Sequence, residues 1–216
     1  MSQTPEFITG LIADLCTGDD FQRTQASFAL SMLGESAVEP LARMLSSPEQ
    51  ELRKRAAKVL GVIGVPAISA LLRLAEGDDA HLRIEAIRVL GIVGEARALN
   101  QILVGLTDPD PHVATRSARA LGKIGDPRAY HSLITALHHP APDVRYEACR
   151  ALVDLRVPDS VSALREIAER DRGRTSWGSG VAEGAHRAIA ELESALAAPA
   201  RDDEFTRASQ MLRRQM

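Results

Sequence analysis

The chain repeats itself about every thirty residues, and this period constrains its fold more than any other property. Equivalent positions in successive copies fall 30, 30, 31, 31 and 37 residues apart. These positions are Ser31, Gly61, Gly91, Gly122, Val153 and Ala190. The four central copies align without gaps from Leu52, Leu82, Val113 and Val144, and weaker copies begin at Gln22 and Val181. A period of this length is typical of solenoids, whose units bury their apolar faces only against one another.

Each copy predicts two antiparallel helices, and the fourth copy illustrates the pattern. Apolar residues recur at helical spacing over 99–106, and the turn 108–111 contains two prolines that end this first helix. The second helix buries one stripe, formed by Val113, Ala118, Leu121 and Ile124. The glycines at 64, 94 and 125 stand where a helix end favours the left-handed conformation. A single pair cannot bury its own stripe, so the pairs must stack.

We therefore expect an all-α solenoid of about six helical pairs spanning residues 1–198. The predicted repeats cover about 5–35, 36–65, 66–96, 97–126, 127–157 and 158–196. Residues 199–216 predict a further, capping helix, because Asp202 or Asp203 suits its start and Phe205, Ala208 and Leu212 share one face.

The stretch LGKIGDPRA, residues 121–129, resembles the HEAT-like repeats of phycobilin lyases and their bacterial relatives. The resemblance covers almost the whole chain and implies the same all-α solenoid. It also implies, as one alternative, a role in handling bilins. Such repeats serve many unrelated functions, so the resemblance is more informative about fold than about activity.

Composition predicts a cytoplasmic protein without a membrane span. Aromatic residues make up only 3%, so the core must consist of Ala, Leu, Val and Ile. Cys16 and Cys149 lie far apart and fit no metal spacing, which is typical of thiols in a reducing compartment. The first basic residue is Arg23, so no basic segment of a secretory signal precedes it. The longest uncharged run, residues 59–72, is shorter than the roughly 18 residues that a membrane span needs.

The sequence offers no catalytic residue, metal site or required cofactor. The strongest enzyme candidate on this scaffold is a resemblance to deoxyhypusine hydroxylase, which binds two irons through His-Glu pairs in its second helices. The matching pairs here are Thr24-Gln25, Lys54-Arg55, Ile84-Glu85, Thr115-Arg116, Tyr146-Glu147 and Glu183-Gly184. No His-Glu pair is present, so this activity is excluded. Phosphate-binding glycine loops and nucleophile elbows are also missing.

A row of cations is the most distinctive feature of the second helices. Five consecutive repeats carry one at the same position, as Lys58, Arg88, Arg119, Arg150 and Arg187. The position one turn earlier holds a second cation in two repeats, Arg55 and Arg116. In two others it holds a glutamate, Glu85 or Glu147, which can pair with the cation three residues later. Second helices line the concave side of such stacks, so the row predicts a binding groove for an acidic partner. The alternative is a solvated face that keeps the protein soluble.

A second series, Arg23, Arg53, Arg83 and Arg145, opens the second helices. An acidic residue precedes this position by four in four repeats, as Asp19, Glu49, Asp79 and Asp110. In HEAT-type repeats this arginine resembles one that pairs with an acidic turn residue of its own or the next layer. We interpret this series as structural.

Trp177 is the only tryptophan and lies in a Gly- and Ser-rich insertion, residues 172–180. A tryptophan on such a loop is typical of an interface anchor. The alternative is that the indole folds back to cover the last layer.

Three functions follow as hypotheses. The first is an adaptor or scaffold that binds an acidic protein in the Lys/Arg-lined groove. The second, implied by the resemblance, is a bilin lyase component or phycobilisome-associated factor, in which arginines pair with propionates and Tyr146 or Trp177 stacks on the tetrapyrrole. The third is nucleic-acid binding, as in HEAT-like DNA-repair glycosylases. The net charge of −3 and the scarcity of aromatics disfavour it.

Overall fold

A computed structural model describes residues 5–197 of the chain and contains twelve α-helices within them. The first helices of the pairs are α1 (Pro5–Thr17), α3 (Glu35–Met44), α5 (Ile68–Glu76), α7 (Leu99–Gly105), α9 (Tyr130–Ala136) and α11 (Ser160–Arg170). The second helices are α2 (Asp20–Leu33), α4 (Gln50–Ile63), α6 (Ala80–Val93), α8 (Pro111–Ile124), α10 (Pro142–Leu155) and α12 (Val181–Ala197). Short 3₁₀ turns, η1 (Val65–Ala67), η2 (Ala96–Ala98) and η3 (Pro127–Ala129), precede α5, α7 and α9.

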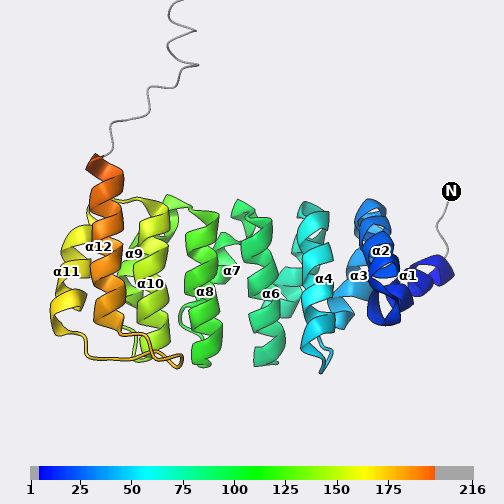
Figure 1. The fold of residues 1–216 in the computed structure, drawn as a ribbon, viewed down its shortest axis with the longest axis horizontal. Coiled ribbons are helices and arrows are strands. Elements are labelled where there is room, and N and C mark those ends of the chain that lie inside the picture. The colour runs from blue at the N-terminus through cyan, green and yellow to red at the C-terminus, as the bar shows by residue number, and fades with distance from the viewer. Residues whose placement is uncertain (1–4, 198–216) are drawn as a thin grey trace, which may run out of the picture.

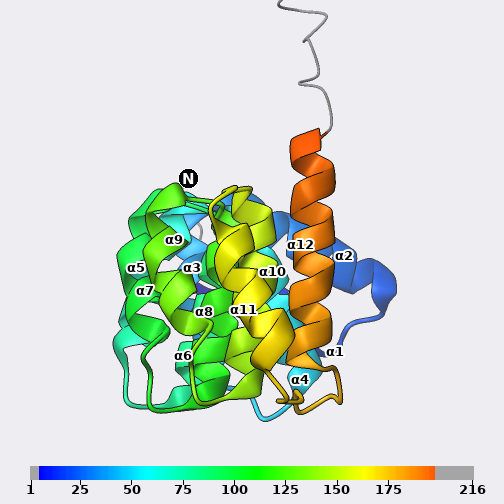
Figure 2. The same ribbon diagram turned by 90° about the vertical axis from the view of Figure 1, so that its left-hand side faces the viewer.

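The twelve helices form two parallel rows, which confirms the predicted all-α solenoid. Figure 1 shows the second helices side by side along the near side of the rod, in chain order from α2 to α12. Figure 2 views the rod from the α12 end, so that the near side of Figure 1 lies on the right. There α2 and α12 lie farther to the right than α8, and the row of second helices is therefore concave. Within residues 5–197 the only β-type pairing is an isolated bridge between Arg174 and Gly180.

Aspartates cap the starts of three second helices, α2, α6 and α8, and positive-φ residues end α2, α4, α6, α8 and α10. Asp19 forms a capping box with Gln22 at the start of α2, and the carboxylate of Asp110 accepts from the backbone N–H of His112 at the start of α8. Gly125 ends α8 in the left-handed conformation. Arg156 ends α10 in the same conformation, with a φ of 54°, where the earlier repeats have glycine.

The core consists of aliphatic side chains and alanines between the layers. Leu121 is fully buried, as the stripe in α8 predicts. Glycines bring neighbouring second helices close together, because a Cβ added to Gly91 would lie 2.8 Å from the Cβ of Ala120. These layers therefore have no room for a side chain at that position.

The predicted capping helix of residues 199–216 lies outside the described residues. No single helix in the described part of the chain is long and apolar enough to cross a membrane. Helix α4 and the following segment Val65–Glu76 are together long and apolar enough for a span, but their axes are bent by 117° with respect to each other.

Candidate partner-binding face

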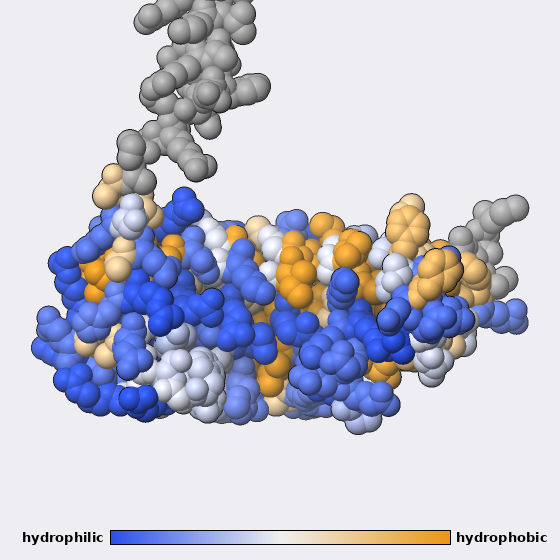
Figure 3. Space-filling view, in the orientation of Figure 1, coloured by the Kyte–Doolittle hydropathy of each residue, from blue (hydrophilic) through white to orange (hydrophobic). Residues whose placement is uncertain are grey.

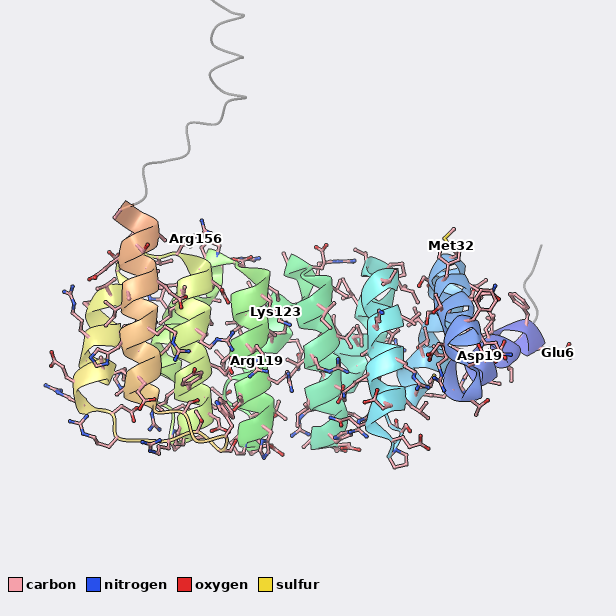
Figure 4. The ribbon with its side chains drawn as sticks, in the orientation of Figure 1. Glu6, Asp19, Met32, Arg119, Lys123 and Arg156 are labelled. Atoms are coloured by element: carbon pink, nitrogen blue, oxygen red, sulfur yellow. The ribbon has the colours of Figure 1, made fainter. Side chains whose placement is uncertain are left out.

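The predicted cation row lies on the outer surface of the second helices, which we call the second-helix face. Lys58, Arg88, Arg119, Arg150 and Arg187 belong to α4, α6, α8, α10 and α12, respectively. Figure 4 shows Arg119 and Lys123 one turn apart on the near side of α8. The 30–37-residue period thus places one cation of the row on each of five adjacent helices.

Two glutamates neutralise part of this row and also connect its layers. The guanidinium of Arg88 donates from Nε to Glu85 at 2.8 Å, and Arg150 lies 3.6 Å from Glu147, so both predicted i,i+3 pairs form. The side chain of Glu147 is only 1% exposed and also accepts from Arg119 of the preceding layer. Glu147 therefore holds α8 and α10 together, a role that the sequence pattern alone did not indicate.

Arg116 is the exception on this face. Its side chain is half-buried, and neither a hydrogen bond nor an ion pair joins it to any residue in 5–197. Burial, together with the nearby charges of Arg119 and Arg88, lowers the pKa of Arg116, and Glu85 and Glu147 offset only part of that effect. A guanidinium that is desolvated among like charges is suited to donate hydrogen bonds to a carboxylate of another molecule.

The other predicted cations divide into exposed and structural groups. Lys58 and Arg187 are exposed, and no ion pair holds either of them among the described residues. Arg55 instead donates to the backbone carbonyls of Leu15 and Cys16, at 3.1 and 3.0 Å, and so satisfies the last turn of α1. Arg55 thus joins the first two pairs, and its guanidinium is already engaged.

The insertion that carries Trp177 folds back onto α10. The backbone N–H and hydroxyl of Ser176 donate to Asp143, both at 2.7 Å. The indole of Trp177 meets the ring of Tyr146 edge to face at 5.7 Å, and Trp177 remains 48% exposed. Tyr146 is buried, so it supports Trp177 and offers little surface of its own. Trp177 therefore covers part of the last layers and still presents half of its surface to solvent.

A cavity of about 350 Å³ opens between α10 and α12 on the same face. Gly184 helps to form it, because a Cβ there would lie 2.7 Å from the ring of Tyr146. Two cations, Arg150 and Arg187, and two carboxylates, Asp154 and Glu191, are among the lining residues of the cavity. Burial raises the pKa of Asp154, and nearby carboxylates add to that rise against the opposing charge of Arg150.

In the second arginine series, Arg83 and Arg145 pair with an acidic turn residue of the next layer, one of the two expected arrangements, but not with an acid four residues earlier. Arg23 pairs instead with Asp20 of its own helix, and Arg53 lies 3.6 Å from Glu85. Arg83 donates to Asp108 at 2.8 and 2.9 Å, and Arg145 donates to Asp171 at 2.6 and 2.9 Å. Each acid belongs to the turn of the next layer. Asp79, four residues before Arg83, instead caps α6, and the position four residues before Arg145 holds Ala141.

The two arginines also bind backbone carbonyls in the turn of their own layer. Arg83 donates to the carbonyls of Gly77 and Asp78, and Arg145 repeats this with His139 and Pro140. The two guanidinium groups therefore clamp consecutive turns. The hydrogen bonds from Arg145 lower the pKa of Asp171 despite its partial burial.

The described residues contain neither a metal-binding cluster nor an activated thiol. No group of three or more His, Cys, Asp or Glu side chains there is arranged to hold a metal ion. Cys149 is buried, and this burial raises its pKa to about 12, so its thiol stays protonated and is a poor nucleophile.

Comparison with known families agrees with the geometry of the stacked pairs. The family model for HEAT repeats matches residues 37–104 and 99–177. The chain belongs to the HEAT repeat family. Comparison with curated proteins found no match to this HEAT-repeat protein.

Solved structures share the architecture at low sequence identity. The complex of CpcE and CpcF of phycocyanin lyase from Nostoc sp. PCC7120 is 20% identical, with a TM-score of 0.62, and the match covers 73% of this chain and 98% of that one. The Escherichia coli protein YibA is 20% identical over 87% of this chain and 73% of its own, with a TM-score of 0.55. A designed armadillo repeat protein in complex with the peptide (KR)4 is 17% identical over 86% of this chain and 99% of its own, with a TM-score of 0.53. These similarities concern the fold.

Proposed function

We propose that this HEAT-repeat protein is a cytoplasmic adaptor that binds an acidic protein segment along its second-helix face. The observation that carries the proposal is Arg116, a half-buried guanidinium that lacks an acceptor among residues 5–197 and lies near the charges of Arg119 and Arg88. Keeping such a cation desolvated costs folding free energy, and a carboxylate from a partner recovers it. Two free cysteines, Cys16 and Cys149, support the cytoplasmic location.

The distribution of charge favours a protein segment over nucleic acid. Exposed carboxylates stand beside the cations of the last two layers, where Asp154 and Glu191 line the same cavity as Arg150 and Arg187. A continuous phosphate backbone would meet these carboxylates, whereas an acidic segment can place its side chains only where cations stand. The armadillo complex with (KR)4 is a precedent for a related repeat architecture that holds a charged peptide, there with the opposite sign.

The test measures the affinity of a short labelled peptide of alternating Glu and Ser by fluorescence anisotropy. Arg116→Gln should weaken binding about tenfold, the equivalent of about 1.4 kcal/mol, because it removes charge-assisted hydrogen bonds to the peptide. The same variant should unfold at an equal or higher temperature, because it removes an uncompensated charge from the folded state.

Arg43→Gln on α3 is the matched control, because Arg43 is an exposed arginine outside the second helices. It should change peptide affinity less than twofold. Equal losses for Arg116→Gln and Arg43→Gln would show that only general surface charge attracts the peptide, and the proposal would then be abandoned.

Tetrapyrrole binding is the second candidate, and the cavity between α10 and α12 favours it. Arg150 and Arg187 stand there ready for propionates, with Tyr146 in the lining and Trp177 packed on Tyr146. If this candidate is right, adding phycocyanobilin should change its visible absorbance, and Arg187→Gln should remove that change. An unchanged bilin spectrum at equimolar protein rejects the candidate.

A further inference from the structure

Large apolar side chains are exposed on the N-terminal half of the second-helix face. Phe28 and Met32 of α2 are 69% and 73% exposed, Val62 of α4 is 66% exposed, and Ile92 of α6 is 47% exposed. In Figure 3, hydrophobic surface lies along the upper part of this face over α2, α4 and α6, above a hydrophilic zone. We call these four residues the apolar strip.

The strip has the same period as the repeats. Met32, Val62 and Ile92 occupy one equivalent position, four residues after the row that contains Lys58 and Arg88. The same position holds polar residues in the later repeats, namely Lys123, Asp154 and Glu191. This position is therefore apolar only in the first three layers. If the fold of the repeat required an apolar residue there, all six layers would have one.

A close contact between α4 and α6 joins two members of the strip. A Cβ at Gly61 of α4 would lie 2.8 Å from Cγ2 of Ile92, so Ile92 reaches across from α6 and covers the space beside Val62. A connected apolar area bordered by charge is typical of a protein-binding surface, whereas single exposed apolar residues are ordinary.

One exposed cation without an ion pair among the described residues stands at the edge of the strip. This cation is Lys58, one helical turn from Val62, whereas Arg88, one turn from Ile92, is already paired with Glu85. A ligand that covers the strip therefore needs apolar groups along one side and carboxylates along the other. This complementarity selects an acidic amphipathic segment.

The spacing of the layers suits a helical ligand. Packed helices lie roughly 8–10 Å apart, and residues seven apart in an α-helix are separated by about 10.5 Å along its axis. A helix lying across α2, α4 and α6 can therefore place every seventh side chain beside Met32, Val62 and Ile92 in turn.

We infer that the apolar strip docks an acidic amphipathic helix of a protein partner, with its apolar face on the strip and its carboxylates on the neighbouring cations. The inference rests on the proposed function and specifies the class of its partner. It also locates the apolar part of the contact in the first three layers, away from the Trp177 insertion.

The test compares two synthetic peptides of identical composition on the full-length protein. In the first, leucines occupy one helical face and glutamates the other. In the second, the same residues are rearranged so that leucines surround the helix. Fluorescence anisotropy should give an affinity at least tenfold higher for the first peptide. Equal affinities overturn the inference, because charge alone would then explain binding.

Substitutions locate the contact. The double variant Met32→Gln and Val62→Thr keeps the size of both side chains and should weaken the first peptide about tenfold. Val104→Thr is the matched control, because Val104 is 62% exposed but belongs to α7, in the other row. It should have an effect of less than twofold. If the double variant has no larger effect than Val104→Thr, the strip is not the docking surface.

Two further outcomes separate this inference from related ones. If Arg116→Gln weakens both peptides equally while the strip variants change nothing, the proposed function stands and the strip inference fails. Vesicles containing anionic lipid provide the last comparison, because apolar and basic groups together also suit a membrane. In one outcome, the protein cosediments with these vesicles, loses this property in the double variant Met32→Gln and Val62→Thr, and binds the first peptide no more tightly than the second. That result assigns the strip to lipid and overturns the inference.

Discussion

At the scale of single residues, two neighbouring cations on α8 have different surroundings. Arg119 is paired with the buried carboxylate of Glu147 and joins two layers, whereas Arg116 is desolvated without an acceptor in the described residues. The two arginines stand three residues apart and have the same chemistry. Glu147 on the next helix pairs with Arg119 alone of these two, and Arg116 is the cation that the proposed function assigns to a partner.

Leu121 provides the residue-scale prediction about stability. Its side chain is fully buried between layers, so Leu121→Ala should lower the free energy of unfolding by roughly 2–5 kcal/mol through lost transfer energy and a residual cavity. Urea denaturation measures this change. Lys123→Ala on the exposed side of the same helix should alter it by less than about 0.5 kcal/mol. A small effect at Leu121 would contradict the inside and outside assignment of α8.

At the scale of the helical elements, the arginine clamps connect each turn to the next. Arg145 binds two carbonyls of its own turn and the carboxylate of Asp171 in the following one. The hydrogen bonds from Arg145 hold the pKa of Asp171 below its usual value, although partial burial opposes them. Because the folded pKa is depressed, the pair stabilises the protein above the unfolded pKa of about 3.9 and loses this contribution as the pH falls through the folded value.

Asp171→Asn tests this linkage. At pH 7 the variant should be less stable by about 1–3 kcal/mol, because Arg145 loses a charged acceptor, while the introduced amide oxygen can still accept from the backbone N–H of Gly173. As the pH falls below the ordinary pKa of an aspartate, about 3.9, and on through the lower folded pKa of Asp171, the difference from wild type should narrow, since wild-type Asp171 becomes protonated. Urea titrations across this range measure both effects. A difference that stays constant with pH would mean that the ion pair contributes no net stability.

At the scale of the whole molecule, the helices of the described residues pack mainly against those of their own and adjacent layers, so the two ends of the stack should respond separately to damage. Leu41→Ala in α3 removes a fully buried side chain far from Trp177, the only tryptophan. The loss of helix followed by circular dichroism should therefore begin earlier than in wild type, while the fluorescence midpoint of Trp177 changes little.

Leu164→Ala in α11 is the opposite case, because this buried residue belongs to the layer beside Trp177. Here the fluorescence midpoint should move to lower urea. Coincident transitions by both probes in both variants would show that the stack unfolds as one cooperative unit.

Local periodicity was sufficient to predict the stacked pairs, because the same apolar stripe and helix-ending glycine recur in copy after copy. It also predicted the cation row and the i,i+3 pair of Arg88 with Glu85. It could not identify Arg119 as the partner of Glu147, or Asp171 as the partner of Arg145, because these pairs join residues 28 and 26 positions apart. Such pairs depend on the rotation between layers, which a repeat pattern within one copy does not specify.

The apolar strip was equally hidden in the sequence. Met32, Val62 and Ile92 resemble core residues in composition, and only their exposure distinguishes them. Comparing the same position across repeats, where Lys123, Asp154 and Glu191 follow, is the signal that can reveal such a surface.

The insertion between α11 and α12 has a mechanical consequence. Ser176 donates two hydrogen bonds to Asp143, in addition to a clamp of Arg145 on Asp171 that an earlier layer also has in Arg83 and Asp108. The last pair therefore has one further attachment to α10. If the two ends of the rod are pulled apart, the earlier pairs can peel away singly, each releasing the chain length of one repeat. The last two pairs should resist together and yield in one longer extension. We therefore expect the C-terminal end of the stack to be stiffer than the rest. A partner that pulls on both ends should extend the N-terminal pairs first.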